Sequence, residues 1–207
     1  MISIRNVVFI VNTVLLCVLI VFNVYFVNGE TSFVDTKEYE YGSDIFFEIT
    51  HPPELQYTYR IRPAKSFGIP FDKERFPSKK TKLVLVDPTH GCEMPTNAKQ
   101  LKGNVAFVKR GSRCSFLKKT IISELSGAKA IVITDNNIYD DTAYVHMIDD
   151  NSEMSANIPA GFLVGKSGHL IHSKMSELMV TELPIVFPLN MTYVPLHKIN
   201  QPPWISI

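Results

Sequence analysis

The sequence predicts an α/β domain built on a mixed, partly curled β-sheet with two helices on its outer side. Three observations lead to this fold class. Short apolar runs with a period of two indicate strands, an amphipathic stretch of helical period lies between two buried runs, and the order of strand and helix then recurs. The chain has 207 residues, 45% of them hydrophobic, which is enough for one domain with a sizeable core.

The first half of the domain is predicted to consist of strands joined by proline-bearing loops. Residues 56–62, QYTYRIR, alternate strictly, with Tyr57, Tyr59 and Ile61 on one face and polar side chains on the other. This alternation is typical of a half-buried strand. Residues 44–50, DIFFEIT, and residues 82–87, KLVLVD, are two further strand candidates.

The centre of the chain predicts a strand, a helix and a second strand. NVAFVKRG, residues 104–111, and AIVITD, residues 130–135, are short buried strands, and the stretch from Ser115 to Gly127 between them is helical. This spacing predicts a right-handed parallel crossover. On the helix we expect one buried side and one outer side: Phe116, Leu117, Thr120, Ile121 and Leu125 inside, and Lys118, Lys119 and Glu124 largely outside.

The same order follows once more towards the end of the chain. NIPAGFLV, residues 157–164, predicts a strand, and Ser167 is placed to cap a helix that continues through HLIHSKMSEL. LPIVFPLNMTYV, residues 183–194, predicts one or two strands, and Pro184 and Pro188 within it indicate a sheet edge.

The stretch GFLVGKSG, residues 161–168, resembles a phosphate-binding loop only in part. A Walker A loop places four residues between its first glycine and Gly-Lys-Ser, whereas only Phe162, Leu163 and Val164 separate Gly161 from Gly165. The stretch is better explained as the turn from a buried strand into a helix.

The amino end predicts entry into the secretory pathway. Residues 7–27 are almost wholly apolar, Arg5 precedes them, and Val27-Asn28-Gly29 is a plausible cleavage site before Glu30. We therefore assign residues 1–29 as a signal peptide, with a retained signal anchor as the alternative, since about 20 apolar residues can span a bilayer. The mature protein is expected to be secreted, with no membrane contact after cleavage.

Charge argues against a nucleic-acid partner. The chain has 21 Lys and Arg against 20 Asp and Glu, and Arg5 is the one charged residue of the leader, so the mature part is formally neutral. A nucleic-acid-binding protein would carry a concentrated basic excess.

Cysteines and one sequon add secretory features. Cys92 and Cys114 would lie in an oxidising compartment and are predicted to form a disulfide worth about 3 kcal/mol. The alternatives are a reactive thiol pair, which lacks the close C-x-x-C spacing, and a zinc site, for which His90 is the only nearby imidazole. Asn190 begins the only N-x-Ser/Thr sequon and is predicted to be glycosylated; an unused sequon is the alternative.

Three segments in order resemble the protease-associated domain family: VAFVKRGSRCSFLKK, then GAKAIVITDN, then IPAGFLVGKSGHLI. The flanking stretches RPAKSFGIPF, YVHMIDD and QPPW resemble small secreted members that consist of this domain alone. The resemblance implies a swivelling β/β/α fold over residues 44–207, with a core at about 80–185. It also implies secretion, N-glycosylation and no catalysis by the domain itself.

The residues themselves offer no catalytic set. Neither a G-x-S-x-G elbow nor H-E-x-x-H occurs, and no cofactor is expected. His169 and His172 are spaced to share a helix face, but two histidines of an amphipathic helix are the simpler explanation, so no metal site is predicted. A metal-dependent hydrolase that uses these histidines or the acidic loop is kept as an alternative.

The loop after the strand at 130–135 is the candidate ligand-facing surface. It follows the carboxyl end of a parallel strand, where ligands bind in open α/β sheets. Its polar residues are Asp135, Asn136, Asn137, Asp140 and Asp141, and Asp140 stands where an EF-hand would need glycine. We therefore predict a non-catalytic module that binds an unknown protein or peptide; the alternative is a membrane-anchored luminal module that sorts cargo.

Overall fold

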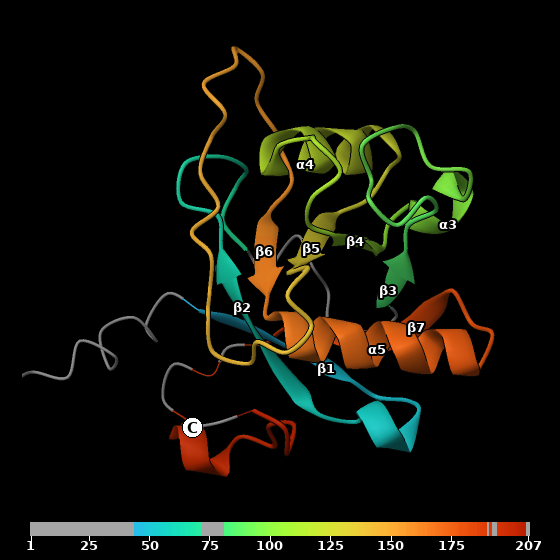
Figure 1. The fold of residues 1–207 in the computed structure, drawn as a ribbon, viewed down its shortest axis with the longest axis vertical. Helices are drawn as coiled ribbons and strands as arrows, with labels where there is room; N and C mark the ends of the chain where they lie inside the picture. The colour runs from blue at the N-terminus through green and yellow to red at the C-terminus, as the bar shows by residue number, and fades with distance from the viewer. Residues whose placement is uncertain (1–43, 72–80, 190, 192–193, 206–207) are drawn as a thin grey trace, which may run out of the picture. The chain divides into compact units, whose positions relative to one another are not determined.

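The computed structural model describes residues 44–71, 81–189, 191 and 194–205. Within them, seven strands close into a barrel in the order β1-β2-β6-β5-β4-β3-β7 (Figure 1). The strands are β1 (Ile45–Ile49), β2 (Thr58–Pro63), β3 (Thr81–Leu85), β4 (Val105–Lys109), β5 (Ala130–Thr134), β6 (Ala160–Leu163) and β7 (Glu182–Leu189). The helices are α3 (Ala98–Leu101), α4 (Phe116–Leu125) and α5 (Gly165–Glu177), with 3-10 turns η2 (Pro53–Leu55) and η3 (Leu196–Lys198).

The sheet is mixed, as predicted, but it closes completely instead of curling in part. Strands β3, β4, β5 and β6 run parallel to one another, and α4 forms the crossover from β4 to β5. The remaining pairs are antiparallel. Closure follows because β1 pairs on both of its edges, with Phe47 opposite Tyr59 of β2 and Ile49 opposite Ile185 of β7.

The prediction of a sheet edge at Pro184 is wrong. β7 is one continuous strand that pairs with β1 on one side and with β3 on the other, and Pro184 lies opposite Lys82. Proline cannot donate to the ladder, but its carbonyl still accepts. The Pro184 carbonyl accepts from the backbone N–H of Thr50 at 3.0 Å and from its hydroxyl at 3.2 Å.

The core has two parts because the central strands are buried on both faces. Alternate residues of β4 show this: Val105 and Phe107 belong to the cluster inside the barrel, whereas Ala106 and Val108 belong to the cluster on its outer side. Inside, the Phe47 ring stacks on that of Tyr59 with centroids 5.2 Å apart. Such aromatic pairs stabilise a core beyond the area they bury.

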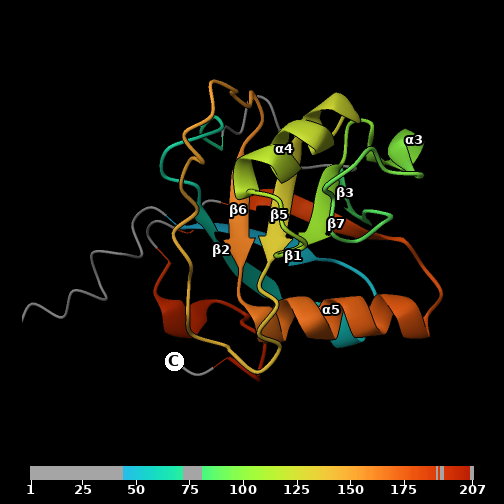
Figure 2. The same cartoon turned by 45° about the horizontal axis from the view of Figure 1, so that its top comes forward.

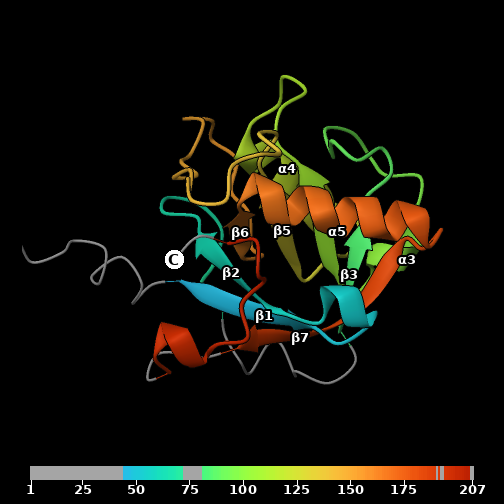
Figure 3. The same cartoon turned by 60° about the horizontal axis from the view of Figure 1, so that its bottom comes forward.

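The two longer helices do not share one side of the sheet. They lie on different sides of the strands (Figures 1 and 2), and Figure 3 views the barrel from the side of α5. Phe116 of α4 packs on the outer cluster, whereas Ile171 and Met175 of α5 belong to the cluster inside the barrel. The expectation of two helices on the outer side therefore holds for α4 alone.

The buried side of α4 also differs from the prediction. Ser115 caps the helix, accepting from the N–H of Lys118 at 3.0 Å, but Lys119 is 0% exposed and Leu125 is 70% exposed. The buried side consists of Leu117, Lys119, Thr120 and Ser123. The aliphatic part of a lysine is readily buried when its ammonium has hydrogen-bond acceptors. The His90 carbonyl is such an acceptor for Lys119.

The glycines of GFLVGKSG are required by close packing of α5. The helix begins at Gly165, so Ser167 lies in its first turn and does not cap it, contrary to the prediction; its hydroxyl accepts from the Trp204 indole at 3.2 Å. A Cβ atom at Gly165 would lie 1.9 Å from the carbonyl oxygen of Asn137, and one at Gly168 would lie 1.6 Å from the hydroxyl of Thr134. The start of the helix thus rests directly on the end of β5 and the loop after it.

Candidate functional site

The long connection between β5 and β6, residues 135–159, begins with the polar residues predicted to face a ligand. Asp135 is buried, and its carboxylate lies 3.1 Å from the Arg110 guanidinium and accepts the backbone N–H of Asn136 at 2.7 Å. The carbonyl of Asn137 accepts from the N–H of Asp140 at 3.2 Å. These groups are therefore engaged within the chain.

Asp140 and Asp141 join the loop to its own backbone and to α5. The Asp140 carboxylate accepts the N–H groups of Ala143 at 2.8 Å and Thr142 at 2.9 Å, and these bonds hold its pKa below the usual value. Its carbonyl accepts the N–H of Lys166, whose ammonium lies 3.5 Å from the Asp141 carboxylate. The predicted residues are brought near one another, in a role that orders the loop.

The middle of the connection is anchored on β2 by Tyr144. The guanidinium carbons of Arg60 and Arg62 lie 4.5 Å and 4.8 Å from the centre of its ring, and the Arg60 Nε donates to its hydroxyl at 2.9 Å. Burial raises the pKa of Tyr144. Both arginines also lie within 3.7 Å of the buried carboxylate of Asp44. Cation–π and ionic contacts of this kind fix the loop against the barrel.

A cavity of about 520 Å³ lies beside this connection. It is lined by Ile45, Ala160 and the segment from Pro63 to Phe71, and most of these side chains are apolar. Two hydrogen bonds join that segment to the connection: the Lys65 N–H donates to the Met147 carbonyl at 3.1 Å, and the Asp149 N–H donates to the Ser66 hydroxyl at 2.7 Å. The cavity and the loop therefore form one continuous surface.

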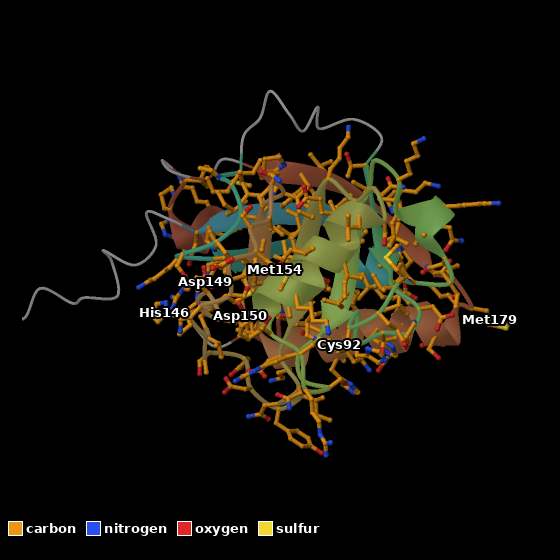
Figure 4. All side chains as sticks on the ribbon, turned by 90° about the horizontal axis from the view of Figure 1, so that it is seen from above. Cys92, His146, Asp149, Asp150, Met154 and Met179 are labelled. Atoms are coloured by element: carbon orange, nitrogen blue, oxygen red, sulfur yellow. A yellow bond between two sulfur atoms is a disulfide. The ribbon has the colours of Figure 1, made fainter. Side chains whose placement is uncertain are left out.

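Exposed side chains extend this surface along residues 146–154, which we call the rim. Ile148 and Met154 are 63% and 50% exposed, and Met147, which directly precedes Ile148, is fully buried and holds the backbone in place. Figure 4 shows His146, Asp149, Asp150 and Met154 gathered in one region, apart from Met179. Hydrogen bonds, first from the Ser115 side chain and then from Ser152, hold the pKa of Asp150 below its usual value.

The cavity was not predicted from the sequence. The stretch that could have indicated it is RPAKSFGIPF, in which two prolines and one glycine interrupt an apolar run. Gly68 adopts a φ of +74°, and a Cβ there would lie 2.7 Å from the Ile158 carbonyl. This close approach bends the segment over the end of β6, where it lines the cavity.

The predicted cysteine pair lies beyond the carboxyl end of β4, which Cys114 follows in the chain. Cys92 and Cys114 form a disulfide-capable pair with Cα atoms 5.9 Å apart, the ordinary spacing of a cystine. Beneath it, the Lys119 ammonium donates to the His90 carbonyl and lies 3.5 Å from the Cys92 Sγ. Burial lowers the pKa of Lys119 to about 8.

The remaining sequence predictions concern the two histidines of α5, a metal site, the sequon and the leader. His172 has a pKa lowered by burial and then by the nearby charges of Lys109 and His169. Over the described ranges, no three His, Cys, Asp or Glu side chains cluster as metal ligands would. Asn190 and the leader at residues 1–29 lie outside the described residues. None of the helices described is both long enough and apolar enough to cross a bilayer.

Comparison with known proteins identifies the family. The PA domain pattern matches residues 79–171. A PRADC1-like protein from Drosophila melanogaster is 48% identical over 167 residues, which cover 80% of this chain and 83% of that protein.

Two larger proteins match over a small share of their length. Signal peptide peptidase-like 4 from Oryza sativa subsp. japonica is 34% identical over 127 residues, covering 58% of this chain and 22% of that protein. A zinc aminopeptidase from Bacillus subtilis aligns with 15% identity and a TM-score of 0.47, covering 69% of this chain and 29% of that chain. The resemblance read from the motifs is confirmed, and the chain belongs to the PA domain family, with similarity to the PRADC1-like protein over most of its length.

Proposed function

We propose that this chain is a secreted, N-glycosylated module that binds a protein or peptide and catalyses no reaction. The leader, the sequon at Asn190 and the likeness to the PRADC1-like protein support secretion and glycosylation. The binding surface is the cavity lined by residues 63–71 together with the rim at residues 146–154.

The cavity is the observation that carries this proposal. Its volume of about 520 Å³ falls within the range of ordinary ligand pockets, and apolar side chains such as those of Ile45, Phe67 and Phe71 line it together with an equal share of polar atoms. A pocket of this size on a protein surface takes one or two large side chains of a partner, which is how buried anchor residues dominate binding energy. The exposed Ile148 and Met154 then provide apolar contact area around that anchor.

The acidic charge of the rim indicates which kind of partner can bind there. Asp150 and Glu153 are exposed and Asp149 is half-buried, while Lys65 is the one basic side chain among the described residues that line the cavity. An apolar anchor flanked by basic residues complements this surface. The hydrogen bonds from Lys65 and Asp149 order the loop before binding, so association loses less conformational entropy.

Filling the cavity should abolish binding of such a partner. Peptides selected from a random display library on the mature protein are expected to carry an apolar residue beside Lys or Arg. In titration calorimetry, Ser66→Trp should weaken their binding at least about tenfold, since the indole would occupy the anchor position.

Two variants serve as controls for that test. Ser66→Ala removes the bond to the Asp149 N–H without filling the cavity and should weaken binding less. Ser176→Trp adds the same indole on an exposed position of α5 and should leave binding unchanged. Equal loss for both tryptophan variants, or unchanged binding for Ser66→Trp, would rule out this surface.

A membrane-anchored luminal module that sorts cargo would use the same surface, and the apolar leader favours it as the second candidate. The mass of the expressed amino terminus separates the two. A mature chain that begins near Glu30 supports secretion, whereas a retained leader supports the anchor.

A further inference from the structure

Lys119 is a buried cation without an anionic partner among the described residues. Its side chain is fully buried, and its ammonium donates to two uncharged acceptors among the described residues, the His90 carbonyl and the Cys92 Sγ. No carboxylate of the described ranges forms an ion pair with it. The atom beside it that can become an anion is the Cys92 Sγ, 3.5 Å from Nζ. Burying a charge is costly without an ionic partner. A Cys92 thiolate would be such a partner, so the Lys119 ammonium stabilises Cys92 in its thiolate form.

The two cysteines are equally accessible, and Lys119 distinguishes them. Cys114 is half-buried, as Cys92 is, and directly precedes Ser115, the residue that caps α4. The ammonium beside Cys92 makes that sulfur the better leaving group and Cys114 the sulfur to be attacked. Ser112 and Arg113 before Cys114 both adopt left-handed backbone conformations, with φ of 62° and 59°. Residues with a Cβ are strained there.

We propose that the Cys92–Cys114 disulfide is a thiol–disulfide exchange site that takes a thiol-bearing small molecule or protein covalently onto Cys114. A thiolate of the incoming molecule attacks the Cys114 Sγ, a new S–S bond forms there, and the Cys92–Cys114 bond breaks. The electron pair of the broken bond leaves on Cys92 as a thiolate beside the Lys119 ammonium. The reverse step, attack by the Cys92 thiolate on the mixed disulfide, expels the thiol and needs no added oxidant.

Nearby carbonyl groups oppose the Cys92 thiolate, but less strongly than Lys119 favours it. The carbonyl oxygens of Ser112, His90 and Gly111 lie 3.5 Å, 3.8 Å and 4.0 Å from the Cys92 Sγ. Each has a partial negative charge, whereas the ammonium carries a full positive charge at 3.5 Å and already binds the His90 carbonyl. Glu93 faces the His90 imidazole at 3.7 Å. With its pKa at about 8, Lys119 is mainly protonated at neutral pH.

The site can be tested with glutathione as the probe. Oxidised mature protein is incubated with reduced glutathione, quenched in acid, alkylated and mapped by peptide mass spectrometry. The expected product carries glutathione on Cys114 and the alkyl group on Cys92. Lys119→Gln, which removes the charge but keeps an N–H donor, should slow exchange about tenfold, and Lys119→Arg should restore most of the rate.

A second measurement separates a charge effect from a change in packing. In Cys114→Ser, the pKa of the Cys92 thiol, taken from the pH dependence of alkylation, should lie below the ordinary value of about 8.5 and rise when Lys119→Gln is added. If Lys119→Gln does not fold, the thiol pKa of Cys114→Ser alone decides. Glutathione on Cys92, no exchange at all, an unshifted thiol pKa, or a wild-type exchange rate in Lys119→Gln would each overturn the proposal. Binding at the cavity is tested separately, by Ser66→Trp.

Discussion

Gly165→Ala is expected to lower the free energy of unfolding by about 3 kcal/mol. The added Cβ would lie 1.9 Å from the Asn137 carbonyl oxygen and 2.7 Å from its carbonyl carbon, and backbone atoms cannot move aside as a flexible side chain can. Either α5 must shift away from β5 or the loop that begins at Asp135 must move. Urea unfolding of the oxidised mature protein, followed by the fluorescence of Trp204, measures the loss.

The matched control is the same substitution at a glycine with open space. A Cβ at Gly111 would meet no atom within 4 Å, although its φ of +98° is unfavourable for alanine. Gly111→Ala should therefore cost about 1 kcal/mol from backbone strain alone. A Gly165→Ala variant that is as stable as Gly111→Ala would show that the helix does not rest on this loop.

The second large effect concerns pH and Lys119. Its pKa in the folded protein is about 8, against 10.5 for the ordinary side chain, and burial is the cause. Below pH 8 the ammonium is present in both the folded and the unfolded protein, so the cost of burying it lowers the stability of the folded protein in full. Between pH 8 and 10.5 the folded protein has lost this proton while the unfolded chain keeps it, so stability rises with pH. The difference between the two pKa values corresponds to about 3 kcal/mol.

Comparison with Lys119→Gln isolates this contribution. Other groups titrate in the same range, but they do so in both proteins and cancel in the difference. The unfolding free energy of the wild type minus that of Lys119→Gln should therefore increase by about 3 kcal/mol from pH 7 to pH 10.5. A difference that stays constant over this range would mean that Lys119 keeps its ordinary pKa and is not buried as a charge.

The strands could be predicted from the sequence because their periodicity is local. Tyr59 and Ile61 are buried as the alternation of QYTYRIR indicates, and the crossover from β4 through α4 to β5 follows from two short apolar runs around a helix. Closure of the barrel could not be predicted in this way. It depends on the pairing of Ile49 with Ile185, two residues far apart in the sequence, and no local pattern encodes that register.

The candidate site was predictable only in outline. The loop after β5 was identified from its place at the end of a parallel strand, but the structure uses Asp135, Asp140 and Asp141 within the chain. Lys119 was assigned to solvent because lysine is rarely buried, and only the tertiary structure places the His90 carbonyl within its reach. The cavity arises where the segment from Pro63 to Phe71 passes Ile45 and Ala160, residues far apart in the sequence, which a linear pattern does not reveal.

Binding of partners at the cavity and its rim can be tested directly by crosslinking. Met154 and Met179 are both exposed, at 50% and 91%, but lie in different regions of the surface (Figure 4). A photo-reactive amino acid at either position of the secreted protein would test this binding in its own culture medium. We expect a discrete adduct from position 154 that is lost in Ser66→Trp, and none from position 179. Adducts from position 179 alone, or adducts from 154 that persist in Ser66→Trp, would contradict the account.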